Sequence, residues 1–135
     1  MADPQPLAAD EIVFRRIPAS VPKWTQGGKV HPSAFLPNKR DVDGVSLCRV
    51  SSAREAAATG RRGAEFYAVA IPVSKMRERG MTVTADRTDH AFIQGWTFEN
   101  RERIERSGDA VYLAAICGPV EGPFPGQFEL PANPN

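Results

Sequence analysis

The sequence predicts a single α+β domain built around one mixed β-sheet. Its 135 residues are enough for one domain and too few for two. Apolar runs of about five to eight residues recur between turn signals, which is typical of strands. A few brief segments between them are rich in Ala or charge, which favours short helices. We therefore expect about five to six short strands and about three short helices within 1–135, followed by a Pro-rich tail.

The N-terminal part contains two predicted strands on either side of a long irregular segment. Residues 1–10 are expected to form a loose lead-in. Residues 11–17 (EIVFRRI) favour a strand, because Ile, Val and Phe suit a pleated surface and Pro18 ends the ladder. Residues 18–44 are rich in Pro and Gly and predict a loop, which Asp43-Gly44 turns into a second strand at 45–50. The side chains expected to pin the loop to the core are Trp24, Phe35 and Leu36.

The middle of the chain predicts two helices and one central strand. Ser51 or Ser52 is a suitable N-cap for a short Ala-rich helix that ends at Gly60. Residues 66–73 (FYAVAIPV) form the most apolar run in the chain and favour a strand, although its Pro indicates an edge or a bulge near its end. A short helix is expected at 75–79.

The C-terminal part predicts three further strands, one surface helix and the tail. Residues 81–85 alternate in polarity, and 90–96 form another strand-like run. Residues 101–106 are mostly charged and predict a surface helix. Residues 110–117 are apolar and are expected to form a last buried strand. Residues 118–135 contain five prolines and predict a tail that wraps the domain or docks elsewhere.

The balance of basic and acidic residues bears on the kind of partner that the chain can bind. Seventeen basic residues against sixteen acidic ones leave a net charge of +1, which is unlike a dedicated duplex-DNA binder. Within 49–87, however, eight basic residues face four acidic ones. This basic segment is either solvated surface or a face for an anionic partner.

Sequence motifs give no direct indication of function. The chain lacks the glycine-rich loops of nucleotide-binding enzymes, the nucleophile motif of α/β-hydrolases and the paired histidines of zinc proteases. Cys48 and Cys117 lie in apolar runs and are expected to be buried thiols. We therefore predict no metal and no cofactor. The chain also lacks an apolar run that predicts a membrane span or a signal peptide, so a cytoplasmic location is expected.

The candidate catalytic residues are the two histidines and one neighbouring aspartate. Histidine titrates near neutral pH, so it is the first choice for a general acid or base. His90 begins a predicted strand directly after Asp89, and His31 lies in the irregular segment. Each histidine also has a purely structural interpretation, as a hydrogen-bonding residue that orders its own loop or strand end.

The candidate ligand-binding residues are Arg16, Arg49 and Ser33. Arg15 and Arg16 lie in the first predicted strand, where alternation sends them to opposite faces. An inward-facing Arg needs a partner, because an isolated buried charge is costly. That partner is either an acidic side chain of this chain, such as Asp41 or Asp43, or a bound anion. The same two alternatives apply to Arg49.

Four short motifs, FRRIP (14–18), HPSAF (31–35), DGVSLCR (43–49) and DHAFIQG (89–95), resemble those of a small uncharacterised bacterial family. The resemblance covers residues 12–95. It implies no activity and transfers no catalytic residue.

Three functional hypotheses follow. The first is a small cytoplasmic bacterial binding or accessory module, without enzymatic activity, for a protein or small-ligand partner. The alternative is an enzyme that acts on a phosphate-bearing substrate, a nucleotide or RNA, with His acid/base catalysis and Arg anion clamps. The third is a nucleic-acid binder that uses the 49–87 segment. The chain is expected to be a monomer or a homodimer.

Overall fold

The computed structural model describes residues 4–129 and shows one domain with a six-stranded β-sheet. The strand order is β4-β5-β2-β1-β3-β6, and every neighbouring pair is antiparallel. The strands are β1 (Ile12–Pro18), β2 (Gly44–Cys48), β3 (Glu65–Pro72), β4 (Val83–Arg87), β5 (His90–Gln94) and β6 (Glu121–Pro125). The α-helices within 4–129 are α1 (Ala53–Ala58), α2 (Val73–Glu78), α3 (Arg101–Ser107) and α4 (Asp109–Ile116). The 3-10 helices in the same range are η1 (Pro22–Trp24), η2 (Gln26–Gly28), η3 (Pro32–Phe35) and η4 (Phe98–Asn100).

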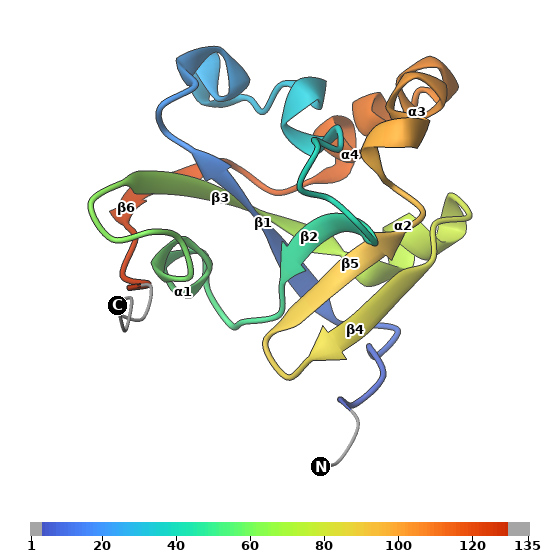
Figure 1. Ribbon diagram of the computed structural model, residues 1–135, viewed down its shortest axis with the longest axis horizontal. Coiled ribbons are helices and arrows are strands. Elements are labelled where there is room, and N and C mark those ends of the chain that lie inside the picture. The colour runs from blue at the N-terminus through green and yellow to red at the C-terminus, as the bar shows by residue number, and fades with distance from the viewer. Residues whose placement is uncertain (1–3, 130–135) are drawn as a thin grey trace, which may run out of the picture.

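The sheet is divided into two halves that meet at one point. β1 pairs with β3 along its whole length, and β2 pairs likewise with β5. Between β1 and β2, however, the only register pair is Phe14↔Cys48. In Figure 1, β1 and β3 run in a clearly different direction from β2, β5 and β4. The two central strands therefore diverge beyond Phe14 and leave the sheet open on that side.

Two apolar cores cover the two faces of the sheet. Alternation along β1 sends Val13 and Ile17 to the larger core and Phe14 to the smaller one. The larger core packs η3, α2, α3 and α4 against the sheet, and α1 covers the smaller one. The largest fully buried side chains of the larger core include Phe35, Ile17, Leu47, Ile71, Met76, Ile93 and Leu113.

The prediction of an α+β domain is confirmed, but two of its details are wrong. The sheet is antiparallel rather than mixed, because no strand–helix–strand segment within 4–129 makes a parallel crossover. Residues 110–117 are not a strand, since Asp109–Ile116 form helix α4. This run is apolar on every side, so it shows no helical period, and an apolar run of this length fits a strand or a buried helix equally well. Its Ala and Leu content favours the helix.

The ends of the described chain are attached to the domain. Leu7 is buried, and its carbonyl accepts a hydrogen bond from Arg77 Nη2 at 3.1 Å, so the lead-in that was predicted to be loose is attached to the domain. Of the predicted tail, the structure describes residues 118–129, which add β6 beside β3 and continue to an isolated bridge between Phe128 and Arg61. The rest of the tail, including Leu130, lies outside the described residues.

The long segment between β1 and β2 folds as three short 3-10 helices rather than as a plain loop. Phe35 and Leu36 are buried in the larger core, and the half-buried Trp24 packs against it. This confirms the side chains predicted to hold the segment in place. The same packing holds η3 close to the open side of the sheet.

Candidate functional site

A groove lies where β1 and β2 diverge. It consists of two adjoining lobes, of about 480 Å³ and 660 Å³, within the range of small-molecule sites. Both lobes are lined by Arg15, Arg16, Ser46 and Arg61, which form the centre of the groove. We call the lobe beside His90 the first lobe and the lobe beside Trp24 the second lobe.

Arg15 occupies the gap that the missing β1–β2 ladder leaves. Its Nη1 donates to the Ser46 carbonyl on β2 at 2.9 Å, and its Nε donates to the Ala34 carbonyl in η3 at 3.0 Å. Burial lowers the pKa of the Arg15 guanidinium, an effect that nearby Asp41 opposes and Arg16 adds to. Arg15 therefore holds a positive charge in a partly desolvated position with carbonyl oxygens, but no carboxylate, as its hydrogen-bond partners.

Arg16 points to the opposite face, as strand alternation predicts. Its Nη1 donates to Thr59 Oγ1 at the end of α1, at 2.6 Å, and its guanidinium lies 5.2 Å from the centre of the Phe66 ring. Gly60 permits this packing, because a Cβ at that position would lie 2.2 Å from the Phe66 ring. Both arginines reach the same groove because the sheet is open between them.

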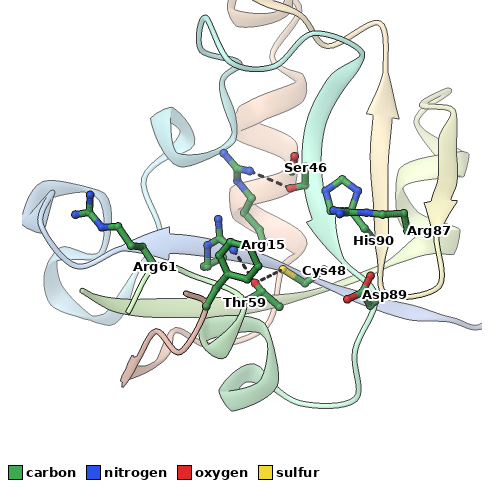
Figure 2. A pocket seen from close by; sticks show the side chains of 10 residues that line it. Arg15, Ser46, Cys48, Thr59, Arg61, Arg87, Asp89 and His90 are labelled. Carbon is green, nitrogen blue, oxygen red and sulfur yellow. Dashed lines mark hydrogen bonds between the residues drawn. The ribbon is translucent and has the colours of Figure 1, made fainter. Parts of the chain in front are cut away.

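The first lobe adds a histidine–aspartate pair. His90 Nδ1 lies 2.6 Å from Asp86 Oδ1, which leaves Nε2 as the ring nitrogen available to a ligand. Asp89, Arg87 and Phe128 complete this lobe, together with Cys48 and Thr59. Figure 2 shows Arg61 at one end of the pocket and His90, Arg87 and Asp89 at the other, with Arg15, Cys48 and Thr59 between them.

The second lobe combines arginines with neutral polar groups and one indole. Arg40 and Arg101 line it, and Arg101 Nη1 donates to the Pro37 carbonyl at 2.6 Å. Trp24 supplies an aromatic wall. Besides Ser46, the neutral polar and acidic side chains of this lobe are Ser20, Ser33, Asn38 and Asp41.

The groove carries a strong local positive charge in a nearly neutral chain. Six arginines line the two lobes against two aspartates, a formal charge of +4 compared with +1 for the whole chain. Among residues 4–129, none of these six forms an ion pair with a carboxylate. Outside the groove, by contrast, Arg49, Arg62, Arg79 and Arg106 all do. Six of the nine arginines that form no ion pair within residues 4–129 thus line one cavity, and the other three are Arg54, Arg77 and Arg103.

The structure brings some of the predicted site residues together and separates others. Arg16, His90 and Asp89 line the first lobe, and Ser33 lines the second. His31 lines neither lobe: its Nδ1 accepts the Ser33 backbone N–H at 3.0 Å and caps η3. The two histidines therefore do not share a catalytic pocket.

Arg49 also lies outside the groove and has a structural role. Its Nε and Nη2 contact the two carboxylate oxygens of Glu11 at 2.6 and 3.0 Å. Its Nη1 donates to the Gln5 carbonyl, and Nη2 donates to the Pro6 carbonyl at 3.2 Å. Of the two alternatives for Arg49, the structure shows the internal ion pair.

Sequence reasoning did not place several groove residues in the site. Arg61 and Arg87 belong to the basic 49–87 segment, which is the one signal that pointed toward them. Arg40 and Arg101 come from segments far apart in the chain and carry no local signal. Phe128 reaches the first lobe because backbone hydrogen bonds tie it to Gly60 and Arg62.

The potential metal ligands and the two cysteines of the described residues have defined positions in the fold. Residues 4–129 contain no group of three or more His, Cys, Asp or Glu that could hold a metal ion. Cys48 and Cys117 are free; Cys48 is buried, and burial raises the pKa of the half-buried Cys117 thiol. Among the same residues, no helix combines the length and apolar character needed to cross a membrane.

Comparisons of the chain with protein-family models, with curated proteins and with solved structures found no match. The geometry of the groove is therefore the basis on which a function can be proposed.

Proposed function

We propose that this protein is a binding module for a small phosphate-bearing ligand, which occupies the groove between β1 and β2. The observation that carries the proposal is the set of six groove arginines without a carboxylate partner within residues 4–129. Like charges in one cavity repel each other, and a bound anion would relieve that repulsion.

Phosphate suits these side chains better than a simple halide or a single carboxylate. A guanidinium is a planar fork that donates two parallel hydrogen bonds to a phosphate, and arginines on several sides can share its oxygens. Arg15 and Arg16 approach the centre from opposite faces of the sheet, and Arg61 approaches from the turn after α1. A tetrahedral anion matches such a three-sided arrangement.

Binding can be tested by calorimetry with adenosine monophosphate, using adenosine as the uncharged comparison. The proposal predicts saturable binding of the phosphate-bearing compound and none of adenosine at the same concentration. Arg61→Ala should weaken binding about tenfold, because it removes a charge-assisted hydrogen bond. Arg103→Ala removes the same charge from exposed α3, outside the groove, and should leave affinity unchanged. Equal losses in the two variants would show a non-specific charge effect and contradict the proposal.

The His90–Asp86 pair favours a second candidate function, an enzyme acting on a phosphate ester in the same groove. In this alternative Asp86 orients the ring, and Nε2 accepts the proton of an attacking hydroxyl or water. The oxygen of that nucleophile bonds to phosphorus while the ester P–O bond breaks, and solvent protonates the leaving oxygen. Arg15, Arg16 and Arg61 would stabilise the charge that develops on the phosphoryl oxygens.

His90→Ala separates the two candidates. For a binding module, adenosine monophosphate affinity changes little and no ester is turned over by either protein. For an enzyme, the wild-type chain cleaves a phosphodiester such as adenylyl-adenosine, and the variant loses about a hundredfold or more of that rate while ligand binding persists. Turnover that is unaffected in His90→Ala would rule out the second candidate.

A further inference from the structure

Each of the two lobes of the groove contains an aromatic side chain that a ligand can reach. The first lobe contains Phe128, whose side chain is 51% exposed and belongs to none of the apolar cores of residues 4–129. The second lobe contains the half-buried Trp24. Phe66 also borders the second lobe, but the guanidinium of Arg16 already covers its ring. Phe128 and Trp24 are therefore the aromatic walls open to a ligand.

The arginines of the groove are also divided between the two lobes. Arg15, Arg16 and Arg61 belong to both lobes. Arg87 belongs to the first lobe alone, and Arg40 and Arg101 belong to the second alone. A ligand that fills both lobes would thus meet the shared arginines, one accessible aromatic side chain in each lobe, and further positive charge in each lobe.

Each lobe also contains polar side chains of the kind that pair with the edges of a nucleobase. Asn38 and Ser33 line the second lobe together with Trp24, and Asp89 lines the first lobe. Amide, hydroxyl and carboxylate groups pair with the donor and acceptor edges of nucleobases, and aromatic side chains stack on base faces. Each lobe is large enough to receive one small-molecule group of its own.

We propose that the groove recognises a nucleoside–phosphate–nucleoside unit, with its phosphate on Arg15, Arg16 and Arg61, one base against Phe128 and the other against Trp24. This inference rests on the proposed function and extends it from a phosphate group to a dinucleotide. Two sources supply the same chemistry: a free dinucleotide and one step of a single-stranded oligonucleotide. The outer arginines, Arg87 and Arg40, would contact flanking phosphates only in the second case.

The first test compares adenosine monophosphate with adenylyl-adenosine by calorimetry. Adenylyl-adenosine should bind tighter by about tenfold, because it stacks a second base. Phe128→Ala should reduce that advantage to less than about threefold. Phe98→Ala removes another partly exposed aromatic side chain, 45% exposed and outside the groove, and should leave the advantage intact.

The outcomes separate the inference from the proposed function. If the two compounds bind equally to the wild-type chain, or if Phe128→Ala preserves the advantage, the dinucleotide inference is overturned while phosphate binding stands. If neither compound binds, both fail. Hexaadenylate distinguishes the two sources. If it binds tighter than adenylyl-adenosine and Arg87→Ala removes that gain in affinity, the ligand is a single strand. If the two compounds bind equally, the ligand is a free dinucleotide.

Tryptophan fluorescence locates the second base. The chain has two tryptophans, and Trp96 is buried at 6% exposure, so a stacked base should quench the emission of Trp24. Trp24→Phe keeps an aromatic wall, and adenylyl-adenosine should still bind it but without the quench. A quench that persists in Trp24→Phe would contradict the placement of a base at this residue.

Discussion

Replacing Arg49 with Met should lower the free energy of unfolding by about 1–3 kcal/mol. Arg49 joins the start of the chain to the sheet through both carboxylate oxygens of Glu11 and the carbonyls of Gln5 and Pro6. The side chains of the pair are 15% and 20% exposed, so water replaces the lost bonds only in part. Hydrogen bonds to charged groups contribute about 1.5–3 kcal/mol in such settings, and Met preserves the aliphatic stem of Arg.

The magnitude translates into a measurable shift in melting temperature. An unfolding entropy of about 2.1 cal/mol/K per residue makes 1 kcal/mol correspond to about 3–4 °C for this chain, so thermal denaturation should show a decrease of about 4–10 °C. The matched control is Arg106→Met, because the Arg106–Glu102 pair is 75% and 84% exposed and should contribute less than about 0.5 kcal/mol. A double-mutant cycle with Glu11→Gln isolates the pair. A coupling near zero, or equal losses in Arg49→Met and Arg106→Met, would refute the reasoning.

Three further predictions concern stability. Leu113→Ala should cost about 2–5 kcal/mol in urea denaturation, because Leu113 is fully buried where α4 packs on the larger core, and a loss below about 1 kcal/mol would contradict that packing. Gly44→Ala should cost about 1–3 kcal/mol or prevent folding, because its Cβ would lie 1.9 Å from the Ile93 carbonyl oxygen; an unchanged melting temperature would show that β2 and β5 are not so close. For Glu11, burial raises the pKa, but hydrogen bonds from Arg49 and the Ala8 N–H, together with the Arg49 charge, outweigh it and hold the pKa below its ordinary value. The contribution of ionised Glu11 to the free energy of unfolding is therefore complete above that ordinary pKa and is lost as pH falls through the lower pKa of the folded state. The difference in melting temperature between wild type and Arg49→Met should then narrow in acid. A difference that stays constant with pH would contradict this linkage.

The sequence predicts the local elements well where one periodicity dominates. The strand at 11–17 alternates between the two cores, as the EIVFRRI pattern and the following Pro indicate. The Ala-rich helix begins after Ser52, whose Oγ accepts the Glu55 N–H at 3.2 Å, as the capping pattern predicts. The prediction of a strand at 110–117 was wrong for the opposite reason. An apolar run with no polar face has no periodicity that distinguishes a helix from a strand.

The site was harder to predict because its centre depends on a tertiary feature. Arg15 and Arg16 share one groove only because β1 and β2 separate after Phe14, and no local pattern reveals the length of a strand pairing. Arg49 shows the reverse difficulty. An arginine directly after an apolar strand has the same local sequence pattern whether its partner is a ligand or a distant residue such as Glu11.

The most direct test of the groove is a titration with adenosine monophosphate followed in the NMR spectrum of the arginine Nε–Hε groups. The signals of Arg15, Arg16 and Arg61 should shift together and saturate with one common dissociation constant, while that of Arg103 should stay in place. If no arginine signal moves, or if the saturating shifts belong to arginines outside the groove, the groove is not a phosphate-binding site.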